Sequence, residues 1–444
     1  MTSTQRPLKS GSWIVSIVSI LSTCLPTAAQ PVPISGTADV SAIEARLDDQ
    51  QAQIDALREE VQAGRGQEEQ DDQDAPGSDP DPDTPHPGDP DPAPVSGAIG
   101  INLGFVGRTN HPDDPTAPGY DELLKPVAGV ARFMNPNRIN DYLTAVDSLD
   151  APHFYATQTW RQALTWQAEL CQRIGADYYF NAPINATPGF VTEAVALIRS
   201  ILDADQVIYV SWANEVWNGS LGPYREVKRI TGVDAGGGAG LAFFSYWASR
   251  LGQTFTAART ADPNCVRVLE TKTARDGTWF TQKVHERLPG AGADYDAVAI
   301  TTYFSVHRTQ MVEGMTIDQA FAAARENWTT REGVYQREGI GWATAHGKRA
   351  ISYEGGQHFW DPFKRASLGE TFRGCQTDPR IAELRGDVLD AAFEAGLDLH
   401  IEFDLLDWWN DNGYWGLADS LANLPGSLKY QSLVEFANRM GQMN

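Results

Sequence analysis

The sequence predicts an α/β protein: a (β/α)8 TIM barrel preceded by a short coiled-coil helix and a disordered, acidic, Pro-rich linker. Three observations lead to this fold class. Eight short β-rich runs recur between residue 98 and the end of the 444-residue chain. Segments of roughly 25–55 residues separate these runs, and most have the apolar spacing of amphipathic helices. Residues 64–97, by contrast, contain almost no apolar side chains.

Each β-rich run is short, apolar and rich in β-branched or aromatic residues, as a buried strand requires. The runs are 99–103, 129–134, 177–181, 207–212, 266–270, 297–303, 350–353 and 399–403. The clearest helices between them are 164–174, 191–202, 241–261, 317–328 and 381–395. Alternating strands and helices indicate parallel βαβ units, and eight units fit a barrel over residues 98–444. A doubly wound open sheet is the main alternative, although no Gly-x-Gly-x-x-Gly motif follows the first run.

The first 29 residues are typical of a secretory signal peptide. Arg6 and Lys9 precede an apolar run over residues 13–25, and small residues at 27–29 offer a cleavage site. The apolar run is too short to span a bilayer comfortably. A lipoprotein signal through Cys24 is the less favoured alternative, because Thr23 fits the pattern before such a cysteine poorly. We therefore expect a secreted, periplasmic or cell-surface protein.

Two further segments precede the predicted barrel. Residues 30–63 are predicted to form an amphipathic helix, and apolar side chains repeat in heptads over residues 40–61. This pattern favours either a homo-oligomer formed through residues 40–61 or an isolated helix that frays in water. Residues 64–97 hold eight Pro and ten Asp or Glu against one Arg. Charge repulsion and proline stiffness predict that this segment is a disordered, extended linker.

The charge and the cysteines limit the classes of partner. The net charge of -23 argues against nucleic acid and against an anionic membrane surface as partners. More than half of the acidic excess of the mature chain lies before residue 98, and residues 98–444 carry only -11. Cys171, Cys265 and Cys375 allow one disulfide and one free thiol, but the sequence does not fix the pairing. No Cys/His cluster indicates a metal, and we predict no cofactor.

Two carboxylates stand where the chemistry of a barrel is expected, at the carboxyl ends of strands. Glu215 follows the fourth run in Ser-Trp-Ala-Asn-Glu-Val-Trp-Asn, and Glu354 follows the seventh run and precedes two glycines. We expect these glycines to permit a sharp turn. Glycosidic bond cleavage requires one protonated carboxyl that donates to the leaving oxygen and one ionised carboxylate. Nearby Trp212 and Trp217 would suit the apolar faces of sugar rings, and burial against them would make Glu215 a proton donor.

The Asn214–Glu215 pair on the fourth strand and Glu354 on the seventh resemble the clan A glycoside hydrolases. This resemblance implies a retaining enzyme with Glu215 as acid/base, Glu354 as nucleophile and Asn214 at the sugar 2-hydroxyl. It also implies an Arg at the second strand, a Tyr at the sixth and a Trp at the eighth. Arg132, Tyr303, and Trp408 or Trp409 stand at these places. Val216 replaces the Pro that many members carry after the acid/base, so the family within the clan stays open.

Further residues complete the predicted carbohydrate site. Arg132 would keep Glu354 ionised and Tyr303 would donate a hydrogen bond to it. Asn181 at the end of the third strand and His358 after the seventh are predicted to contact substrate. Neighbouring residues of an extended segment point to opposite sides, so only one of Trp408 and Trp409 should line the site.

Three classes of function remain open from the sequence. A secreted retaining glycoside hydrolase acting on a β-linked oligo- or polysaccharide is favoured by the two carboxylates. A non-catalytic carbohydrate-binding or cell-surface protein on the same barrel is the alternative, because the coiled coil and linker resemble a display device. A barrel enzyme of another chemistry, such as a metal-dependent hydrolase or a lyase, is the third class, and the scarcity of His at strand ends argues against the metal-dependent version. The sugar, the linkage and endo or exo action cannot be predicted.

Overall fold

The computed structural model describes residues 99–103, 117–154, 158–235, 240–289, 294–410 and 413–441. The predicted signal peptide, coiled coil and linker lie outside the described residues and stay predictions. Within the described ranges, no helix is both long and apolar enough to cross a membrane.

Eight parallel strands close into a barrel in which the spatial order equals the chain order. The strands are β1 (Ile99–Asn102), β2 (Val130–Arg132), β3 (Asp177–Ala182), β4 (Ile208–Trp212), β5 (Val266–Glu270), β6 (Ala297–Phe304), β7 (Arg349–Gln357) and β8 (Leu397–Glu402). β8 pairs with both β7 and β1, which closes the sheet. The predicted barrel and its eight strands are therefore confirmed, and the open-sheet alternative is wrong.

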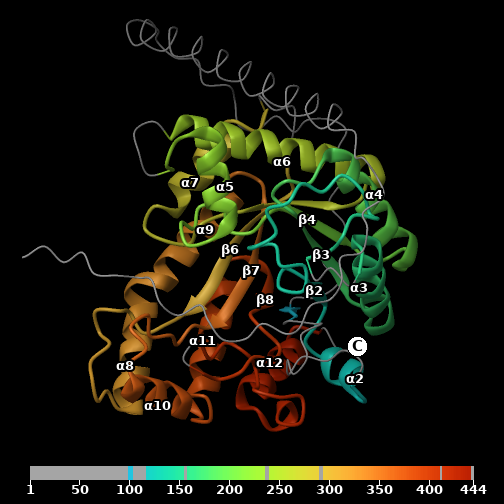
Figure 1. Cartoon of the computed structure of the whole chain (residues 1–444). Helices are drawn as coiled ribbons and strands as arrows, with labels where there is room; N and C mark the ends of the chain where they lie inside the picture. Colours follow the sequence, from blue (N-terminus) through green and yellow to red (C-terminus); the bar gives the residue numbers. More distant parts are fainter. Residues whose placement is uncertain are drawn as a thin grey trace, which may run out of the picture. The chain divides into compact units, whose positions relative to one another are not determined.

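Helices follow the strands and surround the barrel (Figure 1). They are α2 (Tyr120–Leu124), α3 (Trp160–Ile174), α4 (Pro188–Ile201), α5 (Gly222–Thr231), α6 (Leu241–Ala261), α7 (Gly277–His285), α8 (Ile317–Asn327), η2 (Trp328–Glu332), α9 (Gly333–Ala345), α10 (Ala366–Cys375), α11 (Arg380–Glu394), η3 (Leu424–Gly426) and α12 (Leu428–Arg439). The five predicted helices are confirmed as α3, α4, α6, α8 and α11. α3 begins four residues earlier than predicted, because Thr159 and Gln162 form a capping box at its start.

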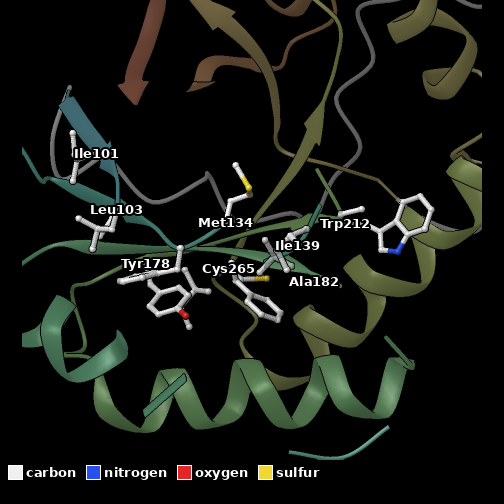
Figure 2. Close-up of a cluster of buried hydrophobic side chains, with 14 of the residues drawn as sticks. Ile101, Leu103, Met134, Ile139, Tyr178, Ala182, Trp212 and Cys265 are labelled. Atoms are coloured by element: carbon white, nitrogen blue, oxygen red, sulfur yellow. The ribbon is translucent and has the colours of Figure 1, made fainter. Parts of the chain in front are cut away.

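Two apolar layers hold the barrel together. The interior is filled by alternate strand residues such as Tyr179, Tyr209 and Ile351. The opposite faces of the strands pack against the helices in a second core. Figure 2 shows part of that outer core, where Ile101, Tyr178, Ala182 and Trp212 gather in one buried cluster. Side chains two apart along a strand share a face, so period-two alternation separates these layers.

The seventh strand corrects one expectation. β7 continues through Glu354 and both glycines to Gln357, so the predicted sharp turn after Glu354 is wrong. Glycine is required at both positions instead because neighbouring side chains lie too close to leave room for a Cβ atom. A Cβ on Gly355 would lie 2.1 Å from Thr302 Oγ1, and one on Gly356 would lie 2.0 Å from Glu402 Oε1. Gly356 also has a φ of 101°, which side chains rarely adopt.

The three cysteines after the predicted signal peptide do not form a disulfide. Cys171, Cys265 and Cys375 are each buried with a free thiol. Each packs in an apolar cluster, where cysteine behaves as a small hydrophobic residue. The pairing that the odd number allowed is therefore not realised.

Candidate active site

A polar network at the carboxyl ends of the strands surrounds the fully buried side chain of Arg132. Its guanidinium Nη1 donates to Glu354 Oε1 at 2.8 Å and to Asn102 Oδ1 at 3.0 Å. Nη2 donates to Asn214 Oδ1 at 2.7 Å and to Glu270 Oε1 at 3.1 Å. Two tyrosine rings face the guanidinium, with centroids 5.3 and 5.1 Å from Cζ. One cation at the end of β2 therefore organises groups from β1, β4, β5 and β7.

Both carboxylate oxygens of Glu354 are held by donors of this network. Its Oε1 accepts from Arg132 at 2.8 Å, and its Oε2 accepts from the Tyr303 hydroxyl at 3.0 Å. Burial raises the pKa of Glu354 to about 7; Arg132 opposes the shift, and the negative charge of Glu215 adds to it. Burial and Arg132 therefore act on this carboxylate in opposite directions, and Arg132 favours its ionised form. Tyr303 stays a donor, because burial and the nearby carboxylates raise its pKa well above the usual value.

Glu215 lies three residues beyond the end of β4 and is held by neutral donors. Its Oε1 accepts from the Tyr353 hydroxyl at 3.0 Å, and its Oε2 accepts from Asn218 Nδ2 at 2.7 Å. The chain around it is strained, since Ala213 and Glu215 have φ values of 59° and 44°. Such left-handed non-glycine residues cost on the order of 1–3 kcal/mol each and cluster at functional sites. The strain is a local reason to place function at this segment.

A β-bulge brings neighbouring residues of β7 into the site together. In the pairing with β6, Ile300 faces Ser352 and Thr301 faces Glu354, so Tyr353 is the extra residue. Tyr353 packs with the interior core, and the Glu354 carboxylate also points to Arg132 inside the barrel. Regular alternation would have sent one of the two outward. Bulges redirect side chains in this way. Here the bulge brings both Glu354 and Tyr353, the donor to Glu215, into the barrel interior from one strand.

The two predicted asparagines have different surroundings. Asn214 accepts from Arg132 and donates to Asn140 Oδ1 at 2.9 Å. Asn181, predicted to contact substrate, uses its amide for Ala213 O and Glu270 Oε1, both at 2.7 Å. It therefore supports the strained backbone that carries Asn214.

The two tryptophans beside Glu215 are not an aromatic wall around it. Trp212 is buried among the outer core and donates through Nε1 to Ile184 O at 3.1 Å. Figure 2 shows it in that outer cluster. The expectation that Trp212 packs against Glu215 is wrong, because side-chain alternation along β4 turns it toward the helices. Trp217 stacks on Trp247 and meets the Tyr353 ring edge-on at 6.0 Å, so it supports the tyrosine that holds Glu215.

A row of rings begins next to Glu354. The His358 ring lies 5.1 Å from the Tyr303 ring, and stacks with Trp415 at 5.6 Å and with Trp360 at 6.3 Å. Burial lowers the pKa of His358 to about 4, so its ring is neutral at neutral pH. Trp360 is 36% exposed. The row extends from the carboxylate network to the surface through the loops after β7 and β8.

Trp408 and Trp409 point to opposite sides, as their adjacency predicts. Trp408 is 41% exposed. Trp409 donates to Gly416 O at 3.1 Å and packs against the second core cluster, with Lys429 Nζ 4.9 Å from its ring. Trp415 is the tryptophan after β8 that joins the ring row.

The sequence analysis missed several residues that the site uses. Glu270, Tyr353 and Asn102 contact the predicted groups directly. Glu270 and Asn102 end β5 and β1, so the strand-end rule that found Glu215 would also have found them. Tyr353 carried no such signal, because alternation assigns it the face opposite Glu354. Over the described ranges, no group of His, Cys, Asp and Glu is arranged to hold a metal ion.

No protein-family model matches this sequence, and no curated protein matches it. The structural neighbours are clan A glycoside hydrolases. They include members of families 10, 51 and 53, all built on the eight-stranded parallel barrel. The likeness confirms the clan-level resemblance of the fold, and the sequence assigns no family within the clan.

Three of these neighbours illustrate the likeness. The family 51 alpha-L-arabinofuranosidase AbfB from Bifidobacterium longum has a TM-score of 0.50 at 11% identity, covering 78% of this chain and 75% of its own. Xylanase 10B from Thermotoga petrophila, solved with xylobiose, has a TM-score of 0.45 at 9% identity, covering 76% and 94%. The family 53 catalytic domain from Ignisphaera aggregans has a TM-score of 0.42 at 13% identity, covering 80% and 98%. At these identities the likeness is one of fold.

Proposed function

We propose that this protein is a secreted retaining glycoside hydrolase that acts on a β-linked oligo- or polysaccharide by double displacement. The observation that carries the proposal is the unequal surroundings of two neighbouring carboxylates. Glu354 contacts a guanidinium and a tyrosine hydroxyl, whereas Glu215 accepts from two neutral donors. Double displacement needs one carboxyl group stabilised as an anion and one that exchanges a proton.

The contacts support Glu354 as the nucleophile and Glu215 as the acid/base. In the first step, the Glu354 carboxylate bonds to the anomeric carbon while the bond to the leaving oxygen breaks and Glu215 gives that oxygen its proton. In the second step, Glu215 takes a proton from water, and the water oxygen attacks the anomeric carbon. The ester bond to Glu354 then breaks and restores both carboxyl groups. Asn214 is proposed to hold the sugar 2-hydroxyl.

The rings near the site support a carbohydrate substrate. His358, Trp415 and Trp360 offer apolar faces beside the proposed nucleophile, and Trp408 is exposed in the loop after β8. Sugar rings carry apolar C–H faces that pack on such aromatic rings. Neutral His358 can also exchange hydrogen bonds with hydroxyl groups. Export and self-association belong to the same proposal, and their support is the sequence patterns of residues 1–29 and 40–61.

The test is a panel of β-linked polysaccharides incubated with the wild type, Glu354→Ala and Glu215→Ala. We expect wild-type turnover of at least one polysaccharide and a loss on the order of 10⁴-fold in Glu354→Ala. Azide should restore activity to Glu215→Ala and yield a glycosyl azide of retained configuration. NMR of the first product formed by the wild type should show the anomeric configuration of the substrate.

Each alternative gives a different result. Binding of an oligosaccharide without turnover over days would favour the non-catalytic carbohydrate-binding protein. Inversion of the anomeric configuration would show that one carboxylate activates water directly while the other carboxyl group protonates the leaving oxygen. Undiminished activity in Glu354→Ala would refute the assignment of the nucleophile.

A further inference from the structure

Glu270 is a third carboxylate of the site, and the double displacement does not use it. It ends β5 and is 4% exposed. Its Oε1 accepts from Arg132 Nη2 at 3.1 Å, from the Tyr179 hydroxyl at 3.0 Å and from Asn181 Nδ2 at 2.7 Å. Its Oε2 is buried and has no hydrogen-bond partner among the described residues. Burying a carboxyl group with hydrogen bonds to only one of its two oxygens costs free energy of folding. A structural role alone therefore explains Glu270 poorly.

The guanidinium of Arg132 is divided between Glu270 and Glu354. Nη1 contacts Glu354 and Nη2 contacts Glu270, so a single positive charge faces two buried carboxylates. The same two nitrogens also donate to the side-chain oxygens of Asn102 and Asn214, and both of these residues are neutral. If both carboxylates are ionised, the cluster carries a net negative charge in a region with little water. Such a cluster resists ionisation of its second member.

The surrounding strands contribute several titratable groups near Glu354, and few of them carry a free charge. Tyr179, Tyr303 and Tyr353 stay neutral, because burial raises each pKa well above the usual value. Glu402 of β8 is neutralised by its ion pair with Arg385 and also contacts His400 Nε2 at 2.9 Å. The charged and titratable groups that interact with Glu354 are Arg132 of β2, Tyr179 of β3, Glu215 after β4, Glu270 of β5, Tyr303 of β6 and Tyr353 of β7. Arg132 is therefore the cation next to Glu354, and Glu270 competes for it.

We propose that Glu270 is a positioning residue that fixes the Arg132 guanidinium and, by taking part of its charge, sets the pH range in which Glu354 is ionised. The effect of Glu270 on catalysis rests on the proposed function. Its effect on the ionisation of Glu354 does not. Burial and the charges of Glu215 and Glu270 raise the pKa of Glu354 against the effect of Arg132. Removing the charge of Glu270 leaves the guanidinium to Glu354, which then ionises at lower pH.

The first measurement needs no substrate. Protein labelled with ¹³C at the glutamate Cδ is titrated by NMR, and the Glu354 signal is assigned by its loss in Glu354→Gln. We expect Glu270→Gln to lower the Glu354 midpoint by about one pH unit or more, which is a tenfold change in the ratio of ionised to protonated form. Glu270→Asp, which keeps the negative charge, should stay closer to the wild-type midpoint. Equal midpoints in wild type and Glu270→Gln would overturn the inference.

A matched control removes a half-buried carboxylate elsewhere in the barrel, one that contacts two cations. Asp296 accepts from Arg267 of β5 at 2.8 Å and from Arg259 at 3.1 Å, and Arg267 lies near the opposite end of the same strand from Glu270. Asp296→Asn should lower stability and leave the Glu354 midpoint unchanged. A shift as large as that of Glu270→Gln would mean that general loosening of the barrel, not the charge of Glu270, moves the midpoint.

The second measurement is the pH dependence of kcat/KM on whichever polysaccharide the wild type cleaves. The acidic limb should move to lower pH in Glu270→Gln, even if kcat falls. A purely structural role predicts a uniform loss with an unmoved limb, and this would count against the inference. If no polysaccharide is cleaved but the NMR midpoint moves as expected, the glycosidase proposal fails and the role of Glu270 toward Glu354 stands.

Discussion

At the scale of single residues, Tyr353 is the least expected member of the site. Its hydroxyl donates to Glu215 Oε1 at 3.0 Å, and its ring lies 5.1 Å from the Arg132 guanidinium. Tyr353→Phe keeps the ring and removes only the donor. We expect kcat to fall about tenfold, because loss of a hydrogen bond to a charged group costs about 1.5–3 kcal/mol and part of this is recovered by water. Steady-state kinetics on the cleaved polysaccharide measures the effect.

Tyr209→Phe is the matched control for this change. Tyr209 is also buried in the barrel interior, and its hydroxyl accepts from Arg349 at 3.4 Å. Arg349 begins β7, so this contact lies at the end of the barrel away from Glu215. Activity should stay within about twofold of the wild type, since no carboxylate of the site is touched. Equal losses in the two variants would show that Tyr353 acts by packing alone.

Site residues at or just after the end of a strand could be predicted from the sequence. Site residues inside a strand were harder to predict. Glu215 and Arg132 stand at strand ends, where the sequence pattern places chemistry. Glu354 stands inside β7 and reaches the site because of the bulge at Tyr353. Sequence alone does not reveal a bulge, because it depends on the register with β6. The same limit hid the inward direction of Tyr353.

At the scale of elements, the close approach of β7 and β8 gives a stability prediction. A Cβ on Gly356 would lie 2.0 Å from Glu402 Oε1, and Glu402 is itself fixed by Arg385 and by His400 at 2.9 Å. The φ of 101° adds backbone strain for any side chain. Gly356→Ala should therefore destabilise the fold by about 2–4 kcal/mol. Urea unfolding followed by circular dichroism measures the change.

Gly386→Ala, a substitution within α11, is expected to raise the stability of the fold instead of lowering it. A Cβ at Gly386 meets nothing within 4 Å, and the residue lies in the middle of the helix. Alanine is the better helix former, so stability should rise by about 0.5–1 kcal/mol. A loss of less than about 1 kcal/mol in Gly356→Ala would show that Glu402 can move aside, against the tight packing of protein interiors.

The segment η2 (Trp328–Glu332) contains a carboxyl group with a pH-dependent contribution to stability. Glu332 accepts from Ser305 N at 2.9 Å and from Ser305 Oγ at 2.5 Å, just beyond the end of β6. Burial raises the pKa of Glu332 to about 7. Because the folded pKa lies above the unfolded value of about 4.3, its contribution is fully present below that unfolded value. It is lost as the pH rises through about 7.

Glu332→Gln tests the direction in which the stability contribution of Glu332 changes with pH. The Gln amide imitates the protonated acid, since it can accept from Ser305 N and donate to Ser305 Oγ. The stability of Glu332→Gln relative to the wild type should rise between pH 5 and pH 8, on the order of 1 kcal/mol. Glu326 of α8 is exposed and accepts from Gln310 Nε2 at 3.0 Å, and Glu326→Gln is the control variant. Parallel pH profiles for the two variants would contradict the expectation.

Element boundaries were predictable where apolar periodicity continues to the end of the element. β7 was predicted to stop at Tyr353, because Glu354, Gly355 and Gly356 have low β propensity. Pairing with β6 nevertheless continues to Gln357, since tertiary contact overrides local preference. The helical run from α8 through η2 and α9 likewise extends to Ala345, although three glycines weaken its pattern after Glu332. In each case the missing information lies in another part of the chain.

At the scale of the whole barrel, the repeat of strand and helix was sufficient for the fold class. Eight βα units have one common way to bury their apolar strands, which is closure into a barrel. The contacts that complete closure span the chain, as when Asn102 Nδ2 donates to Glu402 O at 3.4 Å across 300 residues. These long-range contacts are a consequence of barrel closure. They could not be predicted from the sequence before the closure of the barrel was known. The site inherits them, because it is assembled from strands β1 to β7.

The charge of the domain predicts its choice among polysaccharides. Residues 98–444 carry a net charge of -11, so an anionic chain is repelled at long range while a neutral chain is not. We expect kcat/KM for a neutral β-linked polysaccharide to change less than about twofold between 20 and 500 mM NaCl. Its carboxymethylated form should be cleaved more slowly at 20 mM, and the rate should rise about threefold or more with salt as the repulsion is screened. The two forms share a backbone, so their ratio isolates the charge. Faster cleavage of the carboxymethylated form at low salt would instead reveal a local cationic subsite that the net charge conceals.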